Sequence, residues 1–524
     1  MEMNPPTKEK MRASGFSLVS EDVVENILSR LPALSFASAA CVSRCWNKVC
    51  GRILSKPKLA SALSLNPSLH DAVKEVLEKV LSQPIYPHFA IACIGKQFSL
   101  ELTHQLITEK LGSKVPVITN AASGIIGFDA RNVLKEIKWE SSDDEDDDDE
   151  DDLTDSPDKG IVLVVGFVPG LKVDAIPLLR TKTVPQKALV DKFLMDIRSF
   201  TASVSDCTSP AGIILFGNRN VDMKPVLASM DCAMNEETVI VGDASGCFLY
   251  RSADSSRDNH ADMNLDAVAL VFARDKHKSD DIGEIQFHVT LSTGVMPFGP
   301  HLQAVCVIAK DTECSWLTAR LQGQYDILDA EGLLVDINDQ FNEEESPDLY
   351  IGVVQHRECY IGAESSSRAS LAFYEVIGGD KEFFIIKGVG VKPGDSFLFY
   401  HSDADTASSS CGNAYRSLAN LKEESESKNC LQQTNVEEKE VFGGLIFSCV
   451  LRGESFDQNA ESFPFRENFP GVPLAGVYCG GEIGRGSSSS ISQEDDEANS
   501  ARCCLHYHST VYLVMSYVPA NAED

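Results

Sequence analysis

Three short turns carry the polar and small residues best suited to binding a ligand. Each follows an apolar run that is typical of a strand, and each combines glycine with serine, asparagine, aspartate or glutamate. The candidate pocket residues are Asn120, Ser123, Gly124, Asp243, Ser245, Gly246, Gly480, Gly481 and Glu482. Ligands of α/β sheets gather beyond strand ends, where glycine allows close backbone approach and polar side chains supply hydrogen bonds. The alternative is that these turns only permit tight packing.

Motifs for catalysis and for cofactor binding are missing from the sequence. It contains no phosphate loop of the Gly-x-x-x-x-Gly-Lys-Ser/Thr type, no Gly-x-Ser-x-Gly elbow and no His-Glu-x-x-His pair. The most metal-like cluster is Cys503-Cys504-x-His506-x-His508, in which strand alternation places the two histidines on one face. Zinc ligands have other spacings. We therefore expect no catalytic residue, no metal and no cofactor, and an unrecognised hydrolase or redox enzyme is the least favoured reading.

The three turns each close a unit of the same kind. A strand at 89–95, a helix at 100–111 and a strand at 115–119 precede the first turn. A strand at 211–217, a helix at 224–234 and a strand at 238–241 precede the second, and strands at 444–450 and 472–478 precede the third. This alternation predicts a large α/β region with a mixed sheet and repeated strand-helix-strand units.

The first residues are organised differently, because apolar side chains between 16 and 54 recur at helical spacing. Pro32 ends the first expected helix, and Ser20 and Ser35 are the expected N-caps. About forty residues in short helices cannot bury this much apolar surface alone. Part of that surface should therefore face a partner.

These residues resemble the F-box, the small helical module that docks onto the Skp-type adaptor of cullin-RING ubiquitin ligases. The resemblance rests on Ile27-Leu28-Ser29-Arg30-Leu31-Pro32 and on Val42-Ser43-Arg44-Cys45-Trp46-Asn47, although Val19 stands where the family usually has proline. It implies a role in adaptor docking for Leu18, Ile27, Leu28, Leu31, Pro32, Val42 and Trp46. The alternative is a plain helical cap on the next domain.

The rest of the chain resembles the FIST domain, a sensory module of signalling proteins, most clearly at 443–453, 469–476, 479–484 and 505–513. The resemblance implies sensing of small ligands such as amino acids. We expect an F-box at 12–60, an N-terminal FIST-like half at 70–330 and a C-terminal half at 331–518. We expect an acidic disordered insertion at 140–158, and polar loops at 402–440 and 486–500. No leucine-rich ladder that would predict a horseshoe is present.

The net charge of the chain limits the classes of partner that it can be expected to bind. The formal net charge is −32, and ten consecutive carboxylates run from Asp143 to Asp152. Such a field repels nucleic acids and anionic membranes, so neither is an expected partner. The sixteen cysteines lie scattered in apolar segments, which predicts reduced thiols and a place in the cytoplasm, the nucleus or both.

The sequence thus predicts a non-catalytic substrate receptor of a Skp, cullin and F-box ubiquitin ligase. It would bind the adaptor, and through it the cullin, and recruit an unidentified target protein for degradation, with a small ligand tuning recognition. Catalysis would arise from proximity alone. The rival hypothesis is a stand-alone intracellular small-molecule sensor without any ubiquitin role.

Overall fold

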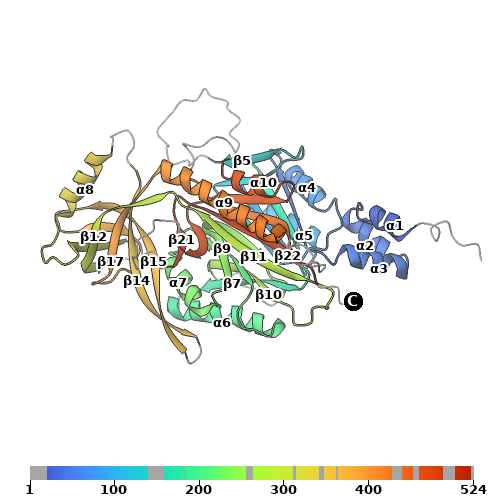
Figure 1. The fold of residues 1–524 in the computed structure, drawn as a ribbon, viewed down its shortest axis with the longest axis horizontal. Helices are drawn as coiled ribbons and strands as arrows, with labels where there is room; N and C mark the ends of the chain where they lie inside the picture. The colour runs from blue at the N-terminus through green and yellow to red at the C-terminus, as the bar shows by residue number, and fades with distance from the viewer. Residues whose placement is uncertain are drawn as a thin grey trace, which may run out of the picture.

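The computed structural model describes residues 20–139, 159–181, 183–254, 264–310, 314–341, 347–361, 364–427, 439–452, 460–487 and 502–520. Leu18, the acidic segment 140–158 and most of the predicted loop 486–500 lie outside these residues. Figure 1 shows three helices at one end of the long axis, a layered body in the middle and a group of strands with one helix at the opposite end.

The helical end consists of α1 (Glu21–Leu28), α2 (Ala33–Ala40) and α3 (Arg44–Ile53). Ser20 occupies the N-cap position of α1, but its side chain makes no capping hydrogen bond. The prediction that Ser35 caps the second helix is wrong, because α2 already begins at Ala33. The reason is Pro32, whose fixed φ favours the entry into a helix.

The first sheet of the body is the eight-stranded part of a larger, 16-stranded sheet, and its strands pair in the order β1-β6-β2-β3-β9-β8-β10-β7. Their bounds are β1 (Lys58–Ser64), β2 (Phe89–Ile94), β3 (Val117–Ala121), β6 (Ile161–Phe167), β7 (Leu171–Arg180), β8 (Gly212–Asn218), β9 (Val239–Arg251) and β10 (Asn264–Arg274). Valine, isoleucine and leucine fill both faces of β6, which is buried throughout. This continuous apolar run is typical of a strand covered on both sides.

The second sheet has six strands in the order β11-β22-β18-β19-β4-β5. Their bounds are β4 (Gly124–Phe128), β5 (Leu134–Lys138), β11 (Glu284–Ser292), β18 (Glu440–Cys449), β19 (Leu474–Cys479) and β22 (Thr510–Val518). One hydrophobic cluster draws residues from both sheets, including Phe216 on β8 and Phe447 on β18 with ring centroids 6.4 Å apart. The two sheets therefore pack face to face.

Helices cover the outer face of each sheet. Clusters of apolar side chains join α4 (Leu69–Val80) and α5 (Leu100–Leu111) to one part of the first sheet, and α6 (Gln186–Val204) and α7 (Lys224–Ala233) to the other. The second sheet is covered by α9 (Ala404–Ser427) and α10 (Phe463–Asn468). The body is thus a four-layer sandwich of helix, sheet, sheet and helix.

The predicted α/β architecture with mixed sheets is confirmed. In each of the three expected units the two strands pair in parallel, namely β2 with β3, β8 with β9, and β18 with β19. The predicted polar loop at 402–440 is wrong over its first half, since α9 occupies it. Ala407, Ala414 and Leu418 form a buried stripe at helical spacing within a serine-rich sequence, and this stripe packs α9 onto the sheet.

A closed antiparallel barrel stands at the far end of the molecule. Its strands follow the order β15-β14-β17-β12-β13-β16, and β16 pairs again with β15. The bounds are β12 (Val295–Ala309), β13 (Cys314–Leu321), β14 (Leu349–Ile361), β15 (Glu364–Gly379), β16 (Phe384–Lys387) and β17 (Ser396–Ser402), with α8 (Ala330–Gln340) beside them. The expected division after residue 330 falls within this segment, behind the first residue of α8.

Two short strands connect the barrel with the body. β20 (Glu482–Ser487) pairs with β9, and β21 (Arg502–His506) pairs with β20 and touches β15. The expected strand carrying both histidines is interrupted, because β21 ends at His506 and His508 adopts a left-handed φ of 49°. Each histidine has its own partner: His506 Nε2 lies 2.8 Å from the Gly484 carbonyl oxygen, and His508 Nε2 lies 2.9 Å from Asp348 Oδ2.

A buried arginine fastens several of these parts together. Arg452 is 3% exposed, and its Nε donates to Glu461 Oε1 over 3.1 Å. Its other donors reach the Ser292 side chain and carbonyl, the Ala407 carbonyl on α9 and the His508 carbonyl. The guanidinium donates to fixed acceptors in four segments of the chain. These hydrogen bonds are directional, so they fix the positions of the four segments relative to one another.

Candidate functional site

The helical end has a small core of its own. Its buried members come from all three helices and are Val24, Leu28, Phe36, Ala39, Val49 and Cys50. The side chain of Ser43 caps α3 by accepting from the Trp46 backbone N–H at 3.2 Å. On the surface, Arg52 of α3 pairs with Glu21 and Glu25 of α1 at 3.5 and 3.4 Å.

Several apolar side chains at this end are left exposed by the described residues. Leu34 is 81% exposed, Val42 65%, Val23 49% and Ile27 47%; we call these four side chains the open face. Its origin is visible in α1, where Val24 and Leu28 point inward and Val23 and Ile27 form a second apolar stripe. A helix has 3.6 residues per turn, so two such stripes cannot both face one small core.

The predicted docking residues are therefore of three kinds. Ile27, Pro32 and Val42 are exposed, Leu31 and Trp46 are half-buried, and Leu28 is fully buried in the small core. Val23 and Leu34 belong to the open face but were not among the predicted docking residues. The doubled stripe in α1 and the leucine that follows Pro32 are the sequence signals that point to them.

The helical end is fixed to the body by a few specific contacts. The Ala33 N–H donates to the Leu81 carbonyl at 2.9 Å, and Leu54 packs against the apolar clusters on both sides of the joint. Lys56 pairs with Glu440 at 3.5 Å, and the Tyr517 hydroxyl on β22 donates to the Ser55 carbonyl at 3.4 Å. None of these contacts involves a side chain of the open face.

Residues of the three predicted turns meet inside the body. The predicted turn that carries Asp243 and Ser245 is wrong, because β9 continues through these residues and pairs first with β8 and then with β3, and Asn120 likewise lies within β3. Asn120 Nδ2 donates to Asp243 Oδ2 at 2.9 Å, and both the N–H and the hydroxyl of Ser245 donate to Asp243 Oδ1, at 2.7 and 2.9 Å. The Gly480 N–H donates to Ser245 Oγ at 2.7 Å. Glu482 lies directly opposite Asp243 in the pairing of β20 with β9.

The remaining predicted pocket residues lie beside this network and serve packing. The Ser123 N–H donates to the Tyr478 carbonyl at 3.1 Å, and a Cβ on Gly124 would come within 2.3 Å of the Ile137 carbonyl oxygen. A Cβ on Gly246 would meet Asn120 Oδ1 at the same distance. Gly480 and Gly481 have no such close neighbour.

Burial dominates the electrostatics of this centre. Asn120, Asp243 and Glu482 are at most 1% exposed. Desolvation raises the pKa of Asp243, although hydrogen bonds from Ser245 and Asn120 oppose the shift. Desolvation raises the pKa of Glu482 further, and the neighbouring charge of Asp243 adds to it. Burial thus shifts both carboxyl groups toward the protonated form.

Thiols complete the surroundings of the two carboxyls. Cys479 Sγ lies 3.7 Å from Glu482 Oε1, and Cys449 is the parallel partner of Cys479 across β18 and β19. Burial raises the pKa of both thiols. No group of three or more potential metal ligands with suitable geometry occurs in the described part of the chain. The groups at this centre can exchange protons and form hydrogen bonds. Among the described residues, the buried Asn120 Oδ1 has no hydrogen-bond partner.

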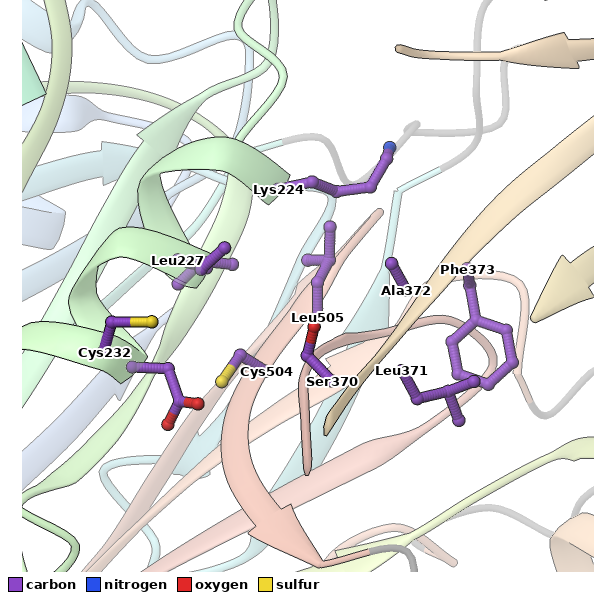
Figure 2. Close-up of a pocket in the computed structure, with 11 residues that line it drawn as sticks. Lys224, Leu227, Cys232, Ser370, Leu371, Ala372, Phe373, Cys504 and Leu505 are labelled. Carbon is purple, nitrogen blue, oxygen red and sulfur yellow. The ribbon is translucent and has the colours of Figure 1, made fainter. Parts of the chain in front are cut away.

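A cavity opens elsewhere, where α7, β15 and β21 meet (Figure 2). It holds about 40 Å³ and is walled by Leu227 and Ala228 of α7, by Leu371, Ala372 and Phe373 of β15, and by Leu505 of β21. Sequence reasoning missed these residues, because the walls come from segments more than a hundred residues apart. No local pattern marks them.

The cysteines beside this cavity correct one expectation. Cys93, Cys449 and Cys479 are free and buried, as expected for reduced thiols. Cys232, which also borders the cavity, is disulfide-bonded. The expectation that every cysteine acts as a reduced apolar side chain is therefore wrong.

Comparison with known proteins shows which families these parts of the chain are similar to. The F-box domain model matches residues 16–58, and the FIST C domain model matches residues 375–485. An F-box/LRR-repeat protein of Arabidopsis thaliana is 39% identical over 511 residues, which cover 95% of this chain and 93% of the relative. In the described part of this chain the strands form the sandwich and the barrel and do not stack as a leucine-rich horseshoe. No helix within the described ranges combines the length and the apolar character that crossing a membrane requires.

Proposed function

Because this chain belongs to the F-box proteins that carry a FIST domain, we propose that it is the substrate receptor of a ubiquitin ligase built from a Skp-type adaptor and a cullin. The observation that carries the proposal is the open face of the F-box. Apolar side chains in that number on one small module indicate a surface that a partner covers.

The energetics support docking through this face. Burying a large aliphatic side chain fully contributes about 1.5 to 3 kcal/mol. Leu34 and Val42, the two most exposed members, therefore offer several kcal/mol to a partner, whereas in the free chain they face water. The small core beneath them holds the helices in the shape that the partner meets.

The role of the large body follows from its attachment. The contacts at Ala33, Lys56 and Ser55 fix the F-box to the sandwich, so that a target held by the body keeps a defined position relative to the adaptor. Proximity of this kind raises the effective concentration of target lysines near activated ubiquitin without chemistry by the chain itself. We place this activity in the cytoplasm or the nucleus.

Adaptor binding by the full-length chain tests the proposal. Leu34→Asp combined with Val42→Asp should abolish retention on an immobilised Skp-type adaptor, because both carboxylates would have to be desolvated at the interface. Met195→Asp is the matched control, since Met195 is 66% exposed on α6 of the body. Leu31 and Trp46 are poorer choices, because they pack against the F-box core.

Two results decide the matter. Loss of retention in the double variant, with the Met195→Asp protein retained, supports docking through the open face. Equal retention of the wild type and a folded double variant would show that the adaptor does not use this face. A wild type that never binds the adaptor would remove the ligase role itself.

The second candidate function is a small-molecule sensor without a ubiquitin role. The convergence of residues from three separate segments on Asp243, with Asn120 Oδ1 unpaired, is the observation that favours it. A panel of free amino acids should then raise the melting temperature of the wild type but not of Asn120→Leu. A ligand that shifts both proteins equally would exclude these segments as the site.

A further inference from the structure

We infer that the cavity between α7, β15 and β21 is a binding site for a small, uncharged, apolar molecule that bridges the body and the barrel. Nothing in the proposed adaptor docking requires this site, and its residues lie outside the three segments that meet at Asp243. Figure 2 shows its walls coming from three elements that are distant in the sequence.

The composition of the walls sets the polarity of the ligand. Leu227, Ala372 and Leu505 present hydrocarbon to the space, whereas Leu371 and Phe373 border it from β15 with side chains on the other side of that strand (Figure 2). Ser370 adds a hydroxyl at the point where β15 touches β21, and that hydroxyl donates to the Gln355 carbonyl over 3.4 Å. A molecule that displaces water from this space gains by burying apolar area.

The two charged residues at the cavity are already paired, which excludes a charged ligand. Lys224 Nζ lies 3.3 Å from Asp222 Oδ1 and 5.0 Å from the centroid of the Tyr374 ring, and Figure 2 shows it directed away from the leucines. Asp231 Oδ1 accepts from Arg485 Nε at 2.7 Å. A charged ligand would therefore find no unpaired opposite charge in the cavity, and no ion pair would offset the free energy of its desolvation.

The volume sets the size. A water molecule needs roughly 10 to 15 Å³ of such space, so a cavity of about 40 Å³ admits about three separate water-sized spheres. Bonded atoms lie closer together than neighbouring waters, so a branched aliphatic group of about five carbons fits, with a hydroxyl at the opening. An occupant of this size would touch α7 and β15 at once and so hold the barrel against the body.

Three molecules that share one hydrocarbon body test the inference. We would titrate 3-methylbutan-1-ol, protonated 3-methylbutan-1-amine and 3-methylbutanoate into the full-length protein with ¹³C-labelled leucine methyl groups. The alcohol should shift the signals of Leu227 and Leu505 in a saturable way, with a dissociation constant in the millimolar range. Both ions should bind at least tenfold more weakly.

Variants that fill the cavity from opposite walls provide the second arm. Ala228→Leu on α7 and Ala372→Leu on β15 should each weaken binding of the alcohol at least tenfold, and each alone suffices if the other fails to fold. Ala188→Leu is the matched control, on the exposed surface of α6. No shift with the alcohol, equal binding of an ion, or unchanged binding in a folded filled variant would each overturn the inference. Adaptor retention, measured in parallel, reports on the proposed function separately.

Discussion

The F-box and the centre of the sandwich depart from the usual distribution of polarity in opposite directions. The F-box leaves Leu34 and Val42 in water, whereas the sandwich encloses Asp243 and Glu482 between its sheets. The enclosed carboxyls have donors from Asn120, Ser245 and Ser509 within the chain. The exposed side chains of Leu34 and Val42, in contrast, are not covered by other described residues of the chain.

This contrast separates two meanings of an unusual residue. A buried polar group that its own chain satisfies contributes to a unique packing and needs no second molecule. An exposed apolar group gains only when another surface covers it. The comparison therefore favours the F-box as the region that binds a partner. It indicates that the polar residues at the centre of the body serve mainly to hold the strands together.

The largest effect that would sharpen this comparison is expected at Arg452. Arg452→Met should lower the free energy of unfolding of the body by about 3 to 5 kcal/mol, because it leaves Glu461 buried without its cation. Urea unfolding measures the loss. Arg416→Met on the exposed side of α9 should change it by less than about 0.5 kcal/mol. Equal effects of the two changes would show that the buried ion pair is not what fastens these segments.

A smaller and more local effect is expected at Leu28, which is 0% exposed. Leu28→Ala should destabilise the F-box by about 2 to 5 kcal/mol through the cavity that it creates. Hydrogen exchange should accelerate across 21–53 and stay unchanged in the sheets of the body. Accelerated exchange throughout the body would mean that the two regions unfold as one unit.

The third effect is a change in pH dependence. The folded pKa of Asp243 is raised, so above the ordinary carboxyl pKa the folded state keeps a proton that the unfolded chain has lost. Stability therefore falls as the pH rises from the ordinary value to the raised one. Asp243→Asn should flatten this fall in thermal melts at stepped pH, because an amide does not titrate. Asn120 can then turn its unpaired Oδ1 toward the new amide. An unchanged slope would indicate that Asp243 is already ionised in the fold.

The smallest effect distinguishes two serines at helix starts of the F-box. Ser43→Ala should cost about 1 kcal/mol, since Ser43 Oγ caps α3. Ser20→Ala should cost far less, because the Ser20 side chain makes no capping bond. Comparable losses at both positions, measured by thermal unfolding, would contradict the capping assignment.

Local periodicity carried most of the fold prediction. The helix expected at 100–111 is α5, and the strand and helix alternation led to the three parallel pairs. Composition misled at 402–440, where serine and glutamate obscured the stripe through Ala414 and Leu418. The family resemblances, now supported by the matches to the F-box and FIST C models, came from short motifs and did not depend on this periodicity.

The candidate sites show which functional residues local sequence patterns cannot predict. The residues around Asp243 could be nominated because polar and small residues follow the apolar runs, although Asp243 and Ser245 lie within β9 and not at the expected strand end. Their burial and their hydrogen bonds to one another depend on how the two sheets stack. The cavity beside Leu227 depends on the approach of β15 to α7, and Ser370 and Leu227 are too far apart in the chain for any local pattern.

The position of β22 has a consequence for how the protein is made. This strand lies between β11 and β18, yet it follows the other described strands of the second sheet in the chain. β11 therefore stays separate from β18 until β22 has been synthesised, whereas the three helices of the F-box carry their own core residues much earlier in the chain. A nascent or prematurely terminated chain would thus present the open face of the F-box while its body is still unfinished.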